Sequence, residues 1–251
     1  APFGIDPISR SDTNTLIGWG HALLDNPSLL TDRLGAETGV GDVRYVVFSH
    51  ENTLGRAHRP SGAHLYPEAK NRIVALAEIL RRFEFRVIFY LRPQASFLES
   101  YYLQLVQQGE FFTFETWLDR VDFDLVSWRP VVEMLRTGFG ADRVSIGDFE
   151  EIHRGQEEFL RDFFLRIDPA IDIHPAYTAR RNPSISEKGL RIALAANPYL
   201  RTTEEKGSMR DFLQKRFSNA KYPRPVLFTG EQRRLLSDRY DAEYRELTGG
   251  A

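Results

Sequence analysis

Short apolar runs and helical patterns alternate over the first two thirds of the chain. Residues 43–48 and 85–91 are rich in β-branched and aromatic side chains, and their apolar positions are continuous rather than alternating. This pattern is typical of strands buried on both faces of a sheet. Between the two runs, Pro67 opens a segment with apolar residues at helical spacing: Ala69, Ile73, Leu76, Ala77 and Leu80. Strand, helix and strand in this order predict a βαβ unit with parallel strands.

The pattern downstream predicts one more short strand and a series of helices. After Pro93 a helix carries Phe97, Tyr101 and Leu105 on one stripe and ends at Gly109. Residues 143–146 predict a third strand, and helices are expected over 114–121, 130–139, 156–167, 186–196, 204–217 and 231–247. The predicted fold class is α/β, a parallel sheet core flanked by helices. We expect one domain over 1–251, with its core at about 40–170 and a helical C-terminal part at about 171–251.

Composition narrows the function classes. The chain has 251 residues and a formal charge of −2, so its overall charge does not attract nucleic acid or an acidic membrane. It has no Cys, which excludes disulfides and Cys nucleophiles and fits a reducing compartment, so we expect a cytoplasmic location. No apolar run is long enough to predict a membrane span. The six His residues show no metal-ligand spacing, so no metal is predicted.

The first candidate site lies at the end of the second predicted strand. Arg92 ends that strand, and Ser96 and Ser100 lie four residues apart on the next helix, near its N-terminus. A guanidinium, helix amides and hydroxyls that converge in this way suit a phosphate group. The alternative is that Arg92 and Pro93 form a turn and the serines are only solvated.

This segment resembles the 3′-phosphate-binding segment of the sulfotransferase family. The resemblance consists of a strand, an Arg-x-Pro-like turn and a Ser eight residues after the Arg. It implies that Arg92 and Ser100 bind the 3′-phosphate of the co-substrate 3′-phosphoadenosine 5′-phosphosulfate. Residues 143–152 and 159–164 are also similar to passages of that family, and residues 182–186 resemble the loop after the core in its bacterial members that act on glycans.

The resemblance implies a P-loop NTPase-like three-layer fold and transfer of a sulfuryl group to a hydroxyl of a carbohydrate or glycolipid. The acceptor hydroxyl must lose a proton as it attacks, so a general base is needed. In the bacterial family that this chain resembles, the strand that corresponds to residues 43–48 often ends in Ser-x-Glu, which makes Glu51 the first candidate here and His50 the second. The alternative is that Glu51 caps the loop or pairs with an Arg.

Other residues are weaker candidates for the same site. His21 lies in a segment that resembles part of the family's acceptor side, and His58 and Arg59 could contact an anionic acceptor. Arg180 and Arg181 could supplement the 3′-phosphate site. Structural or surface roles remain open for all five of these residues.

One family element is not found in this sequence. Sulfotransferases hold the 5′-phosphosulfate with a loop of the type Lys-(Ser/Thr)-Gly-Thr-Thr, and no such stretch occurs here. Either it lies upstream of Ala1, which the family's order of elements favours, or the chain is a degenerate member that lost it. In the second case we expect a non-catalytic nucleotide- or glycan-binding module. A P-loop kinase of related fold is the other alternative, but it needs a Walker loop and a Mg²⁺-binding Asp.

Overall fold

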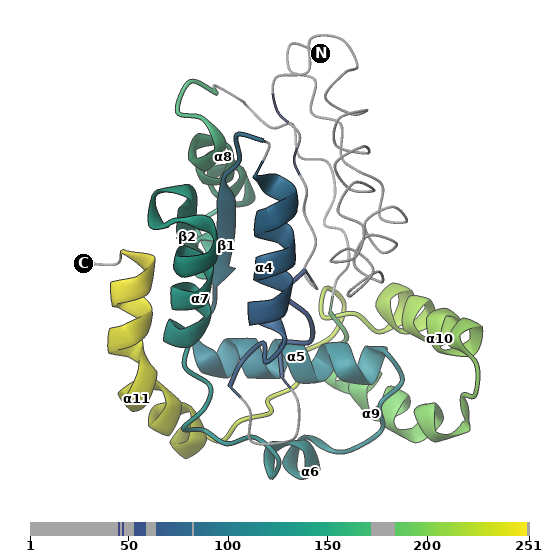
Figure 1. Ribbon diagram of the computed structural model, residues 1–251. Coiled ribbons are helices and arrows are strands. Elements are labelled where there is room, and N and C mark those ends of the chain that lie inside the picture. Colours follow the sequence, from purple (N-terminus) through teal and green to yellow (C-terminus); the bar gives the residue numbers. More distant parts are fainter. Residues whose placement is uncertain are drawn as a thin grey trace. The chain divides into compact units, whose positions relative to one another are not determined.

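The computed structural model describes residues 45, 47, 53–58, 64–81, 83–171 and 184–249 (Figure 1). Over these residues the fold is mixed α/β. Strands β1 (Val87–Leu91) and β2 (Val144–Asp148) pair as a two-stranded parallel sheet. Both were predicted, within two residues at each end. The strand predicted at 43–48 lies outside the described residues, apart from Tyr45 and Val47.

The helices follow the predicted pattern closely. Their bounds are α4 Ala69–Leu80, α5 Gln94–Gln107, α6 Phe114–Leu118, α7 Arg129–Phe139, α8 Gln156–Ile167, α9 Glu187–Ala196, α10 Thr203–Arg216 and α11 Gly230–Thr248, with 3-10 turns η1 Ala141–Arg143, η2 Phe149–His153 and η3 Asn197–Tyr199. The prediction was too long for α6, because after Leu118 the chain turns more tightly and Val121 N donates to Leu118 O. No helix in the described part of the chain is both long and apolar enough to cross a membrane.

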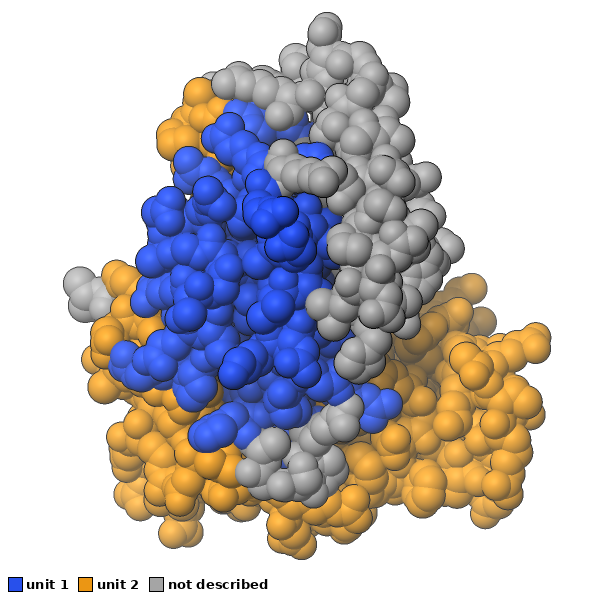
Figure 2. Space-filling view, viewed as in Figure 1, with its two compact units in different colours: residues 1–59, 63–89, 129–145 blue, residues 60–62, 90–128, 146–251 orange. Residues whose placement is uncertain are grey.

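The chain divides into two compact units, which Figure 2 distinguishes by colour. The first comprises residues 1–59, 63–89 and 129–145. In it α4 packs against α7, and the two helices lie side by side in Figure 1. Gly138 lies so close to the Ile73 side chain that a Cβ would not fit between them. The rings of Phe85 and Phe139 meet edge to face, with their centroids 5.9 Å apart. This unit therefore has its own packed core.

The second unit comprises residues 60–62, 90–128 and 146–251, and α5 is its central helix. Helices α9, α10 and α11 all contact α5. Beside it lies an aromatic core in which Tyr102 is edge to face with Phe114, and Phe114 with Phe228, at centroid distances of 5.1 and 4.9 Å. The Asn197 amide donates to the carbonyl of Val106 in the last turn of α5 and to that of Glu110 just after the helix. Burial on several sides fixes α5 and, with it, the position of the strand–helix turn.

Candidate functional site

The turn between β1 and α5 contains Arg92. β1 ends at Leu91, and α5 begins at Gln94 after Pro93, whose ψ of 139° keeps the chain extended up to the helix. No side chain caps this helix start. The first N–H groups of a helix have no acceptor within it, and they carry the positive end of its dipole. The turn therefore places a cationic side chain next to a helix terminus that favours anions.

Arg92 is held in place by contacts that include Phe149 and Trp128. The Cζ atom of its guanidinium lies 3.7 Å from the centroid of the Phe149 ring, and its carbonyl accepts a hydrogen bond of 2.7 Å from Nε1 of Trp128. Trp128 is 2% exposed, so this hydrogen bond is shielded from water. Stacking uses the face of a guanidinium, whereas its N–H groups point outward from its edge. The half-buried Arg92 is therefore oriented by its surroundings rather than free to rotate.

Helix α11 supports this turn from residues far along the chain. The Glu243 carboxylate accepts hydrogen bonds from Trp128 N at 2.8 Å and Ser127 Oγ at 2.7 Å. The Tyr244 hydroxyl donates to Asp148, the last residue of β2. Burial raises the pKa of the Tyr244 phenol above its ordinary value, and the hydrogen bond to Asp148 adds to this rise. Sequence reasoning missed both α11 residues, and no local signal marked them.

The structure gives the two predicted serines different surroundings. Ser96 donates from Oγ to Oε1 of Glu150 at 3.3 Å, and His153 lies 3.5 Å from the other oxygen of the same carboxylate. Ser100 is exposed, and its hydroxyl makes no hydrogen bond to a residue that the structure describes. A bound anion would meet the negative charge of Glu150 near Ser96. The Glu150 carboxylate therefore counts against Ser96 as an anion ligand, whereas Ser100 has no carboxylate on its hydroxyl among the described residues.

The remaining predicted site residues are His58 and six residues that the structure does not describe. Glu51, His50, His21, Arg59, Arg180 and Arg181 lie outside the described residues. His58 belongs to the first unit and is 5% exposed, and this burial lowers its pKa below the ordinary value. Its imidazole is therefore neutral near pH 7. The surroundings of His58 are those of an interior side chain rather than a solvated loop.

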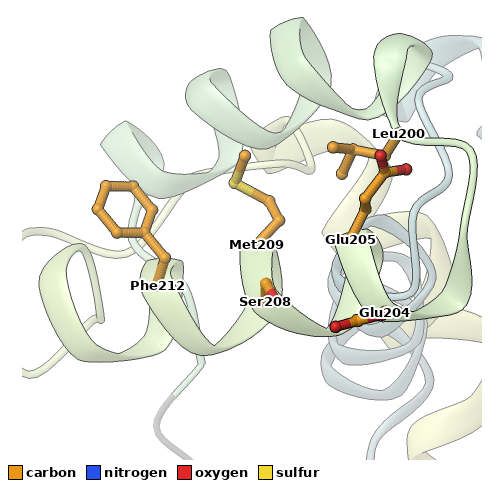
Figure 3. Close-up of a pocket in the computed structure, with 6 residues that line it drawn as sticks. All are labelled: Leu200, Glu204, Glu205, Ser208, Met209 and Phe212. Carbon is orange, nitrogen blue, oxygen red and sulfur yellow. The ribbon is translucent and has the colours of Figure 1, made fainter.

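An open hollow of about 420 Å³ lies along η3 and α10 (Figure 3). Its lining residues are Leu200, Glu204, Glu205, Ser208, Met209 and Phe212. Met209 and Phe212 rise from the same side of α10 in Figure 3. Hydrogen bonds from the backbone N–H groups of Thr202 and Arg201 hold the pKa of Glu205 below its ordinary value. Two carboxylates in the lining oppose an anionic nucleotide, so this hollow does not suit the predicted donor.

The β1–α5 turn combines a guanidinium with the uncapped start of a helix, two groups whose chemistry favours an anion. No group of three or more His, Asp or Glu side chains that could hold a metal ion occurs in the described part of the chain. Comparisons of the whole chain with protein-family models, curated proteins and solved structures each find no match. The case for a function therefore rests on the chemistry of the turn.

Proposed function

We propose that this chain is a sulfotransferase that moves the sulfuryl group of 3′-phosphoadenosine 5′-phosphosulfate to a hydroxyl of a carbohydrate or glycolipid. In this proposal Arg92 and Ser100 bind the 3′-phosphate of the donor. The observation that carries it is Arg92, held over Phe149 at the end of a parallel strand and directly before an uncapped helix. In open α/β sheets, ligands bind beyond the carboxyl ends of the strands, which is where Arg92 lies.

The chemistry of each group supports this assignment. A guanidinium can donate two parallel hydrogen bonds to a phosphate, and a preorganised one loses less entropy when it does so. The N-terminus of α5 adds partial positive charge, and Ser100 supplies an exposed hydroxyl at the end of its second turn. Asp148 accepts hydrogen bonds from Tyr244 and from Glu150 N, which reduces its repulsion of an anion. We assign Ser96 to Glu150 rather than to the ligand.

The rest of the proposal concerns residues outside the described part of the chain. Glu51 or His50 takes the proton of the acceptor hydroxyl as its oxygen attacks sulfur. The bond from sulfur to the phosphate oxygen breaks, and 3′-phosphoadenosine 5′-phosphate leaves. Arg180 and Arg181 add positive charge at the 3′-phosphate. The proposal implies that β1 and β2 belong to a larger parallel sheet of the P-loop NTPase-like three-layer type.

Calorimetry with 3′-phosphoadenosine 5′-phosphate tests the assignment. Hydrogen bonds to charged groups contribute about 1.5–3 kcal/mol, so we expect Arg92→Ala to weaken binding by about 10- to 150-fold. Arg136→Ala is the matched control, because this exposed arginine lies near the end of α7 in the first unit. We expect the affinity of the control variant to equal that of the parent chain. Equal affinities of the two variants for the nucleotide, or no binding by the parent chain, would contradict the proposal.

A further inference from the structure

A second cationic surface lies in the C-terminal part of the second unit, where the loop after α10 meets the start of α9. The backbone fixes this junction: Ser186 N donates to Phe217 O at 2.8 Å, Glu187 N to Pro223 O at 3.0 Å, and Asn219 N to Ser184 O at 2.8 Å. Here we define the basic–aromatic surface as three sets of residues. The first is the ring cluster of Phe212, Phe217 and Tyr222 with Lys188. The second is Lys221 and Lys215, whose carbonyl accepts from Lys221 Nζ at 2.7 Å, and the third is their exposed sequence neighbours Arg216, Arg224 and Val226.

The aromatic residues of this surface form a row. The rings of Phe217 and Tyr222 are stacked with their centroids 6.0 Å apart, and Phe212 meets Phe217 edge to face at 5.5 Å. The ammonium of Lys188 lies 5.3 Å from the centroid of Tyr222 and 5.5 Å from that of Phe217. Phe212 and Tyr222 are 46% and 39% exposed, and Val226 is 86% exposed. Large apolar side chains that are this exposed mark a surface to which a partner protein or a membrane can bind.

The cations of this surface have no carboxylate partners among the residues that the structure describes. They are all exposed: Lys188, Lys215, Arg216, Lys221 and Arg224. The nearest acidic residues in the sequence are already paired, Glu187 with Arg191 at 2.5 Å and Asp211 with Arg210 at 3.7 Å. At physiological ionic strength charges are screened beyond about 8 Å. The local excess of positive charge therefore acts independently of the chain's net charge of −2.

We propose that the basic–aromatic surface binds the face of an anionic lipid bilayer. Lys and Arg side chains attract acidic headgroups, while exposed aromatic and aliphatic side chains enter the boundary with the acyl chains. A nucleic acid is the weaker alternative. Base stacking needs an open ring face, but Tyr222 is stacked on Phe217, and Val226 adds nothing to a polyanion. This surface is separate from the Arg92 turn, and the inference does not depend on the proposed sulfotransferase activity.

Sedimentation with vesicles tests the inference on the full chain. The vesicles contain phosphatidylcholine and phosphatidylserine in a ratio of about seven to three, and pure phosphatidylcholine vesicles are the reference. Each basic side chain near an acidic membrane contributes about a fivefold change in affinity, so Lys221→Gln with Arg224→Gln should weaken binding about 25-fold. Lys70→Gln with Arg136→Gln is the matched control from the first unit. Thermal unfolding verifies that each variant folds.

The aliphatic residue separates a bilayer from a soluble polyanion. We expect Val226→Ser to weaken binding to the acidic vesicles about fivefold, because the variant no longer buries an apolar side chain in the lipid. Val74→Ser is its control, since Val74 is 57% exposed on α4. An absence of vesicle binding, or equal binding by surface and control variants, would overturn the inference. It would also fail if a single-stranded oligonucleotide bound as tightly as the vesicles while Val226→Ser had no effect.

Discussion

Removal of the Tyr244 hydroxyl tests whether α11 holds the end of β2 in place. Tyr244 is 8% exposed and donates to Asp148, so Tyr244→Phe leaves a carboxylate without one of its donors. A hydrogen bond to a charged group contributes about 1.5–3 kcal/mol, and we take about 2 kcal/mol for this one. In a domain of this size 1 kcal/mol lowers Tm by about 2–4 °C, so we expect a decrease of about 4–8 °C.

Differential scanning calorimetry at neutral pH measures this shift. Tyr199→Phe is the control. Tyr199 lies in η3 and is 80% exposed, so this variant loses the same phenolic hydroxyl at a position that faces solvent. We also expect Tyr244→Phe to weaken binding of 3′-phosphoadenosine 5′-phosphate several-fold, since Asp148 then repels an anion more strongly. A Tm equal to that of the Tyr199 variant would refute the claim that this bond supports the turn.

Two further predictions concern ionisable side chains of the second unit, Glu150 and Tyr102. Glu150→Gln should tighten binding of 3′-phosphoadenosine 5′-phosphate about fivefold in calorimetry, because a unit charge near a half-buried anion opposes it by about 1 kcal/mol; weaker binding would show that Glu150 assists the ligand instead. Burial, together with Glu115, raises the pKa of Tyr102 to about 12. Its contribution to stability is therefore complete below pH 10 and is lost as the pH rises from 10 to 12. Urea unfolding should show a smaller loss over that interval in Tyr102→Phe, and parallel curves for the two proteins would contradict this.

The helices and strands were predictable because their signals are local. The helical spacing of apolar residues predicts α4, and capping boxes at Thr202 and Thr229 fix the starts of α10 and α11. The burial of α5 was harder to predict. Phe97, Tyr101 and Leu105 share a stripe, as predicted, but they are half-buried. The neighbouring stripe of Leu98, Tyr102 and Val106 is the more deeply buried one, because α9, α10 and α11 contact this helix.

The candidate site was predictable only in its local part. Arg92 and the two serines lie within nine residues, so the strand–turn–helix pattern was enough to predict that Arg92 follows β1 and that both serines lie on α5. The contacts that distinguish them come from distant residues. Glu150 binds Ser96 across 54 positions in the sequence, and Glu243 reaches Trp128 across 115. No periodicity encodes such pairs, because they depend on how whole helices pack.

The central claim is that Arg92 binds the 3′-phosphate of an adenine nucleotide. A thermodynamic cycle tests it most directly: calorimetry of 3′-phosphoadenosine 5′-phosphate and of adenosine 5′-phosphate, each with the parent chain and with Arg92→Ala. We expect the parent chain to prefer the ligand with the 3′-phosphate by about tenfold or more, and we expect Arg92→Ala to abolish this preference. A preference that survives in Arg92→Ala, or equal binding of both ligands to the parent chain, would contradict it.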